Sequence, residues 1–63
     1  MISTTYDAEA DALYVRIAAK EAAITETREI EPGVILDMDH AGRFIGIEIL
    51  DVRARAVAPT VAA

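Results

Sequence analysis

Acidic residues at alternate positions are the first feature of this chain with the potential for chemistry. Asp7, Glu9 and Asp11 have the spacing found in loops that offer oxygen ligands to a hard cation such as Ca²⁺. The glycine that lets a calcium loop turn sharply is missing, and position 18, where a bidentate glutamate would be needed, is alanine. The alternative is a turn in which Asp7 and Asp11 accept hydrogen bonds from backbone amides, and we favour this turn.

A second pair of carboxylates, Asp37 and Asp39, shares the outer side of a predicted strand. Paired carboxylates can act as general acid and base, or can hold Mg²⁺. The simpler interpretation is a charged, solvent-facing side of a hairpin, with Asp39 as the first residue of its turn. We favour the simpler interpretation, because short acidic motifs are weak evidence for a site.

Glu48 is the most unusual carboxylate, because it lies between Ile47 and Ile49 and shares its side of the strand with Phe44 and Leu50. A buried glutamate needs a partner, since an isolated buried charge is very costly. A perturbed carboxylate in a pocket would be a catalytic candidate, but a structural ion pair or an interface hydrogen bond is favoured. The candidate partners are Tyr6, Tyr14, Arg16 and Arg28. The candidate polar cluster, functional or structural, therefore consists of Tyr6, Asp7, Asp11, Tyr14, Arg16 and Glu48.

Other familiar chemistries lack their residues. The chain has one histidine, His40, and no cysteine, which excludes disulfides, thiolate metal sites and a Cys/His nucleophile. Three scattered glycines make no phosphate-binding loop. We therefore assign no catalytic residue, no metal and no cofactor, and an enzyme is the less favoured class.

Size and charge favour an interaction protein. A chain of 63 residues makes one domain and is marginally stable alone, and without disulfides or a metal it needs a partner subunit. We expect a homo-oligomer, preferably a homodimer. The net charge of −5 disfavours nucleic acid and suits a protein partner. The sequence has no apolar stretch of transmembrane length and no visible signal peptide, so we expect no membrane association and a cytoplasmic protein.

Alternation of apolar and polar residues predicts two hairpins. The first joins strands at residues 2–6 and 12–18, and the second joins strands at residues 34–39 and 44–50 across a turn in which Gly42 is left-handed. Residues 24–31 read as a charged edge strand. Pro32-Gly33 follows as a type II turn, and whether the chain reverses or merely kinks there is open.

The last residues predict a short helix and a tail. Residues 51–56 can form the helix with Asp51 as its N-cap, and residues 57–63 should fray. The fold class is mainly β (a β-rich α+β protein): a small antiparallel sheet of four or five strands built from hairpins, with a short C-terminal helix. One β-rich domain at residues 1–56 carries it.

Several ordered motifs resemble a known family. They are Tyr6-Asp7-x-Glu9-x-Asp11-Ala12-Leu13-Tyr14-Val15, Pro32-Gly33-Val34-Ile35, Asp37-x-Asp39-x-x-Gly42-Arg43 and Gly46-Ile47-Glu48-Ile49-Leu50. Together, over residues 2–52, they resemble the small prokaryotic proteins grouped as domain of unknown function 2283. The resemblance implies a compact β-rich fold and no chemistry, and some relatives look like members of two-gene modules of the toxin–antitoxin kind. The alanine-rich end departs from the more polar, lysine-containing segment of the relatives.

Two functional hypotheses follow. The favoured one is a self-associating protein-interaction module, in an antitoxin-like role with a basic partner. The alternative is a metal-dependent or acid/base enzyme that uses Glu48 or the Asp37/Asp39 pair.

Overall fold

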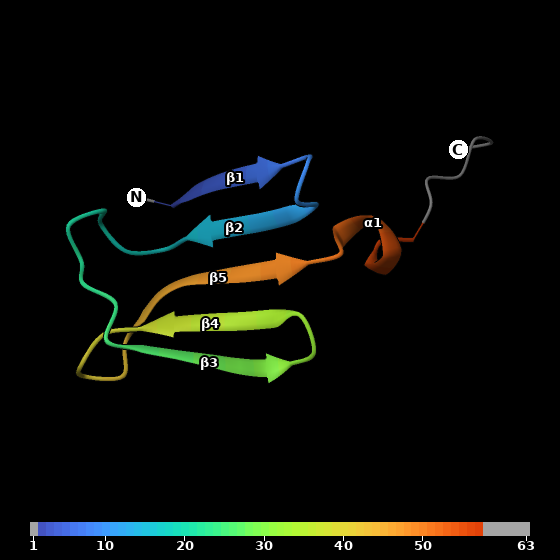
Figure 1. Cartoon of the computed structure of the whole chain (residues 1–63). Helices are drawn as coiled ribbons and strands as arrows, with labels where there is room; N and C mark the ends of the chain where they lie inside the picture. The colour runs from blue at the N-terminus through green and yellow to red at the C-terminus, as the bar shows by residue number, and fades with distance from the viewer. Residues whose placement is uncertain (1, 58–63) are drawn as a thin grey trace.

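The chain folds into one five-stranded antiparallel sheet followed by a single helical turn (Figure 1). The computed structural model describes residues 2–57. The strand order is β1-β2-β5-β4-β3, so β5 is central and β1 and β3 are the two edges. The elements are β1 (Ser3–Asp7), β2 (Ala12–Arg16), β3 (Glu26–Glu31), β4 (Val34–Met38), β5 (Phe44–Leu50) and α1 (Val52–Arg55).

The register of the central strands gathers the aliphatic residues on one side of the sheet. Opposed residues in neighbouring strands lie on the same side, and side chains alternate along each strand. Leu13, Ile49 and Val34 make one row across β2, β5 and β4, and a second row lies beside it. We call this side the apolar face; its residues are Leu13, Val15, Val34, Leu36, Ile47 and Ile49.

The other side of the same strands is mostly polar. Tyr14 of β2 lies opposite Glu48 of β5, and Asp37 of β4 lies between Thr27 of β3 and Gly46 of β5. We call this side the polar face; it carries Tyr14, Arg16, Thr27, Glu29, Ile35, Asp37 and Glu48. The alternation of two residues read from the sequence therefore separates the two faces correctly.

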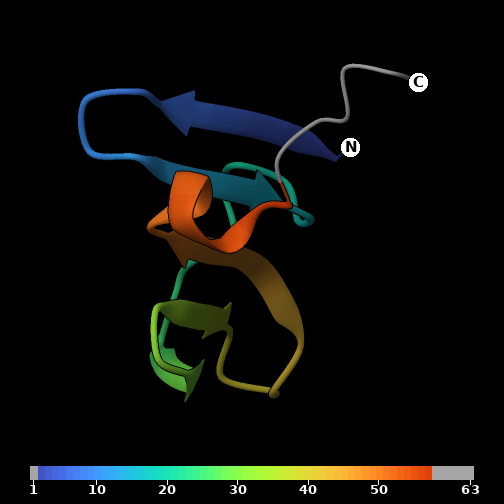
Figure 2. The ribbon, with the colours of Figure 1, turned by 90° about the vertical axis from the view of Figure 1, so that its right-hand side faces the viewer.

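Very little of this sheet is enclosed. Within residues 2–57, Met38 and Ile45 are the only buried hydrophobic residues, with 5% and 1% of their surface exposed. The extensive contacts between elements all join neighbouring strands. Viewed from the end at which α1 lies, the ribbon is a twisted single layer (Figure 2). Met38 and Ile45 continue this side of β4 and β5 and close it at one end, whereas the six residues of the apolar face stay half-buried.

The predicted fold class is confirmed, including five strands and the edge position of β3. The chain reverses at Pro32-Gly33, where Gly33 has a φ of +79°, and Gly42 is left-handed with the same φ. No helix of the described residues has the length and apolar character needed to cross a membrane. The predicted tail at residues 57–63 lies outside the described residues except for Val57, which is 94% exposed.

Candidate functional site

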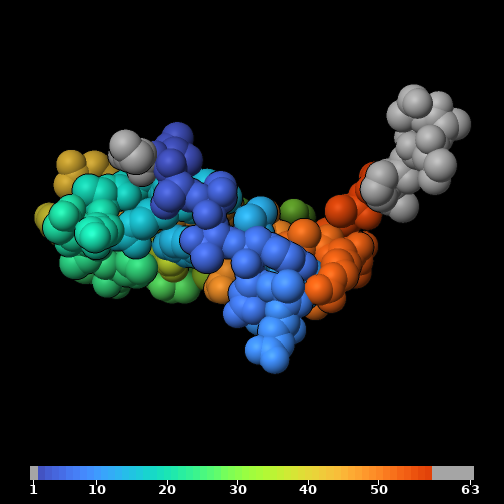
Figure 3. Space-filling view, turned by 90° about the horizontal axis from the view of Figure 1, so that it is seen from above, coloured from blue at the N-terminus to red at the C-terminus, as the bar shows by residue number. Residues whose placement is uncertain are grey.

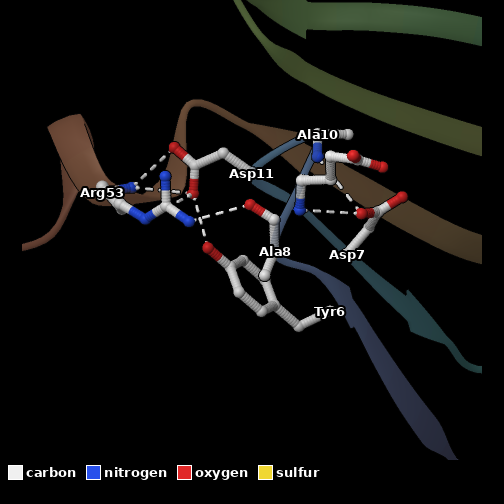
Figure 4. Close-up of polar contacts among 7 residues, drawn as sticks. Tyr6, Asp7, Ala8, Ala10, Asp11 and Arg53 are labelled. Carbon is white, nitrogen blue, oxygen red and sulfur yellow. Dashed lines mark hydrogen bonds and ion pairs between the residues drawn. The ribbon is translucent and has the colours of Figure 1, made fainter.

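Asp11 is the centre of the densest group of polar contacts, at the end of the sheet that carries α1 (Figure 4). Its carboxylate accepts hydrogen bonds from the Tyr6 hydroxyl at 2.7 Å and from the Arg53 backbone N–H at 3.1 Å. The Arg53 guanidinium donates to the carbonyl of Ala8 at 2.8 Å. We call Tyr6, Ala8, Asp11 and Arg53 the Asp11 cluster.

The Asp11 cluster caps the helix from a distant part of the chain. Asp51 was expected to cap α1, but it has a left-handed φ of 54° and its side chain makes no cap hydrogen bond. The first N–H groups of α1 point instead at Asp11, whose carbonyl accepts from Val52 at 3.3 Å and whose carboxylate accepts from Arg53. The correction has a physical reason: a carboxylate held in the β1–β2 turn satisfies the same orphan amides that a local cap would.

Electrostatics within the Asp11 cluster are consistent with a charged carboxylate. The hydrogen bond from Tyr6, followed by the bond from the Arg53 amide and its nearby charge, lowers the pKa of the Asp11 carboxyl below its ordinary value. The bond to Asp11 raises the pKa of the Tyr6 hydroxyl. Near neutral pH a neutral Tyr6 hydroxyl therefore donates its hydrogen bond to a charged Asp11 carboxylate.

Asp7 and Glu9 do not join Asp11 in a cation site. The Asp7 carboxylate accepts hydrogen bonds from the backbone N–H groups of Glu9 at 3.0 Å and of Ala10 at 3.2 Å, as a turn residue does. No group of three or more metal-ligating side chains occurs among residues 2–57. The turn interpretation of this motif agrees with these contacts.

Tyr14 is the centre of a second polar group, on the polar face. Its hydroxyl donates to the Asp37 carboxylate at 2.9 Å, and Thr27 donates to the other oxygen of Asp37 at 3.0 Å. The ring of Tyr14 lies over Gly46, where a Cβ would come within 2.5 Å of the Tyr14 Cζ atom. Burial, and then the bond to Asp37, raises the pKa of the Tyr14 hydroxyl. We call Tyr14, Thr27, Asp37 and Gly46 the Tyr14 cluster.

Glu48 lies beside this cluster but outside its hydrogen bonds. It is half-buried between Tyr14 and Ile35, and within residues 2–57 no hydrogen bond or ion pair reaches its carboxylate. Of its predicted partners, Arg16 donates to the carbonyls of Ala19 and Ala22, at 2.9 and 3.4 Å. Partial exposure leaves water to solvate the Glu48 carboxylate, which removes the need for an ion pair.

Two further candidates bind their own surroundings. Arg28 pairs with Glu26 in the same strand at 2.5 Å. Asp39 accepts from the backbone amides of Ala41 and Arg43 and from the Arg43 guanidinium, each at 2.9 Å. The amide of Arg43 is the main cause of the lowered pKa of the Asp39 carboxyl. Asp39 is thus a turn residue that binds its own turn, whereas the carboxylate of Asp37 accepts from Tyr14 and Thr27.

The candidate polar cluster is therefore distributed over the sheet. Tyr6 and Asp11 meet at one end, Tyr14 and Glu48 are neighbours on the polar face, and Asp7 and Arg16 bind separate loops. A surface pocket of about 310 Å³ lies at the opposite end, beside the β2–β3 connection. Its lining consists of Ser3, Arg16, Ala18, Ala19, Lys20 and Glu21. None of the acidic candidates Asp37, Asp39 and Glu48 lines this pocket.

Sequence reasoning missed the two arginines of α1. Arg53 binds the β1–β2 turn, whereas Arg55 donates to the carbonyl of Leu50 at 2.6 Å and to the carbonyl of Pro32 in the β3–β4 turn. Together they connect the β1–β2 turn and the β3–β4 turn to the end of β5. Their spacing of two residues directly after an apolar strand was the available signal, but it does not reveal carbonyl partners elsewhere in the chain.

The comparisons with known proteins identify a family and nothing more specific. A family model described as "Protein of unknown function (DUF2283)" matches residues 3–53. The chain therefore belongs to this family, as the sequence motifs suggested. No curated protein and no solved structure matches the chain.

Proposed function

We propose that this member of the DUF2283 family is a self-associating protein-interaction module. In the proposed homodimer, the apolar face of one copy packs against the apolar face of the other. The observation that supports the proposal most directly is the incomplete core: six aliphatic side chains lie together on three adjacent strands, and none of them is buried.

Contact of the apolar face with water has a free-energy cost that burial in a dimer would remove. The six side chains keep at most about a third of their surface exposed, so the complete burial of one of them in an interface stabilises by about 0.5 kcal/mol. Six such residues on each copy contribute on the order of 6 kcal/mol, while association itself costs about 4–15 kcal/mol. The two quantities are comparable, so we expect a dimer that dissociates on dilution.

Charge on the polar face has the opposite character. Asp37, Glu29 and Glu48 lie on this side of β4, β3 and β5, and they favour contact with water. In the three central strands one face is apolar and the other is charged, which is the pattern of a layer that packs on one side. Only at the β3 edge, among the five strands, do charged residues such as Arg28 and Glu26 lie on the apolar side. The apolar face is therefore the side that we expect to be covered in the dimer.

A matched pair of substitutions tests the proposed interface. Ile47 is on the apolar face and Ile35 is on the polar face, and both are half-buried residues in neighbouring strands. Ile47→Lys places a charge in the interface, whereas Ile35→Lys places the same charge beside Glu48 and Glu29.

The measurement is the mass in solution by light scattering over a range of concentrations, with circular dichroism as the test of folding. We expect the wild type and Ile35→Lys to exceed the mass of one 6.8 kDa chain, and we expect Ile47→Lys to show a lower mass. A wild type that stays at one chain mass and melts cooperatively at a temperature independent of concentration would refute the proposal.

A basic protein is the partner that the net charge of −5 favours beyond a second copy. This is the antitoxin-like role that the family resemblance suggests. Such a complex should weaken as salt increases, because screening reduces attraction between opposite charges. The homodimer should instead strengthen with salt, because its two copies carry charge of the same sign.

A further inference from the structure

The two edges of the sheet differ in how they are protected against pairing with another strand. An edge strand exposes backbone N–H and C=O groups that another strand can bind. At one edge, β3 carries four charged residues out of six and has an irregular register between Glu29 and Glu31. Charge and a local bulge are two of the devices that prevent edge-to-edge association.

The β1 edge has neither device. Ser3 to Asp7 pairs with β2 in an unbroken register, contains no proline or lysine, and is exposed at every residue. Its single charge, Asp7, is at the end of the strand, where the carboxylate binds the amides of Glu9 and Ala10. The view from above, onto this edge, shows β1 lying open across the surface (Figure 3).

We propose that β1 is a second association site, at which the β1 strands of two copies pair antiparallel about Thr5. This proposal goes beyond the apolar-face dimer and does not depend on it. In this register Thr5 faces Thr5 of the other copy, Thr4 faces Tyr6, and Ser3 faces Asp7. No like charges meet, and a threonine opposite an aromatic residue is a favourable cross-strand pair.

Self-pairing of β3 would be less favourable. An antiparallel match of its six residues places Glu26 opposite Glu31, so that like charges meet at both ends of the pair. The irregular register near Glu29 would also disturb the hydrogen bonds of an added strand. The edge at which a second copy fits is therefore β1.

A second copy is the favoured occupant because its addition closes the assembly. Two sheets joined through β1 form a ten-stranded sheet whose outer strands are both β3. Both ends then carry the protected edge, so growth stops at two copies, as in an isologous interface. An unrelated extended peptide would cover β1 equally well, and the experiment distinguishes it.

The test uses the fact that position 5 faces itself in the proposed register. Thr5→Lys and Thr5→Glu each place like charges opposite one another, on an exposed residue whose side chain has no hydrogen bond to lose among residues 2–57. Each variant alone should show half the wild-type mass by light scattering. An equimolar mixture should restore the wild-type mass, because lysine then faces glutamate. Thr25→Lys and Thr25→Glu, near the β3 edge, are the matched controls and should change nothing.

The same masses separate this proposal from the apolar-face dimer. If both interfaces exist, the wild type has the mass of four 6.8 kDa chains. The single variants Thr5→Lys and Ile47→Lys then each have the mass of two chains, and the variant that combines both substitutions has the mass of one chain. If only the β1 interface exists, the wild type has two chains, Thr5→Lys has one, and Ile47→Lys still has two.

Three results would overturn the proposal. They are a wild type with the mass of one chain, a folded Thr5→Lys variant with unchanged mass, or a mixture of the Thr5 variants that stays at the lower mass. A wild type with the mass of one chain would leave an unrelated extended peptide as the remaining occupant of β1. If circular dichroism shows an unfolded variant, hydrogen exchange of the wild type decides instead: the outward amides of β1 must become more protected as the protein concentration rises.

Discussion

The packing of Tyr14 on Gly46 leads to a prediction that can be worked out from the geometry. A Cβ on Gly46 would lie within 2.5 Å of the Tyr14 Cζ atom and 2.9 Å from its Cε2 atom, closer than ordinary packing allows. Gly46→Ala must therefore displace the ring and with it the hydrogen bond to Asp37. Overpacking of this kind costs about 1–3 kcal/mol.

The backbone conformation at Gly46 is one that alanine can adopt without strain. Gly46 is absent from the positions with positive φ, and glycine inside a strand is disfavoured relative to alanine by about 0.5–1 kcal/mol. Once the ring is removed by Tyr14→Val, the same Gly46→Ala change should become neutral or slightly stabilising. The coupling energy between the two positions should thus be about 1.5–3 kcal/mol.

The assay is urea unfolding followed by circular dichroism at one fixed protein concentration, for the wild type, both single variants and the double variant. In thermal unfolding the Gly46→Ala change should lower Tm by about 4–8 °C per kcal/mol for a domain of this size. Tyr14→Phe is the control: it removes the hydroxyl oxygen, which is the atom nearest to the added Cβ, but it keeps the ring carbons at 2.5 and 2.9 Å and so keeps most of the clash. Effects that add within about 0.5 kcal/mol would refute the reasoning.

Three further predictions concern single sites. Because the pKa of Asp11 is lowered in the folded state, its contribution to stability is present above about pH 4 and is lost as pH falls through the folded value. Urea midpoints measured against pH should therefore fall at acid pH, and Asp11→Asn should make this fall smaller. Because the pKa of Tyr14 is raised, its contribution to stability is present below about pH 10 and lost as pH rises through the folded value. The pKa of Tyr6 is raised as well, so an ultraviolet phenolate titration should show both tyrosines ionising late, and Tyr14→Phe should remove one of the two. Gly33→Ala should lower the urea midpoint more than Gly42→Ala, since both have a φ of +79° but only Gly33 lies against the Arg55 guanidinium; equal losses would contradict this packing.

Local patterns predicted most of the sheet. Alternation placed β5 at its observed bounds, and the turn residues before Gly42 were sufficient to mark the reversal between β4 and β5. At Pro32-Gly33 the sequence predicted a turn but left open the reversal that the structure shows. The order of the strands was not predicted beyond the hairpins. The pairing of β2 with β5 joins residues thirty or more positions apart in the sequence, and period-two alternation does not specify which strands become neighbours.

Long-range polar contacts were the part that sequence reasoning could not supply. Asp11 was singled out for its spacing with Asp7, but one of its partners, Arg53, is 42 residues away. Asp51 is a favoured residue type for a helix cap, yet Asp11 accepts from the first amides of α1 instead. A residue type and its neighbours indicate what a side chain can bind, whereas the partner depends on which segments the sheet brings together.

The distribution of polar partners explains why the association surfaces are where they are. At the α1 end, Asp11, Arg53 and Arg55 use their hydrogen bonds to join the two hairpin turns to β5. On the polar face, Tyr14 and Asp37 join β2 to β4 across the central strand. Both sets stabilise the sheet from its end and its polar side, so neither the apolar face nor the β1 edge has to be covered for these contacts to form. A fold held in this way can keep those two surfaces available for a second copy, which is the condition that both proposed interfaces require.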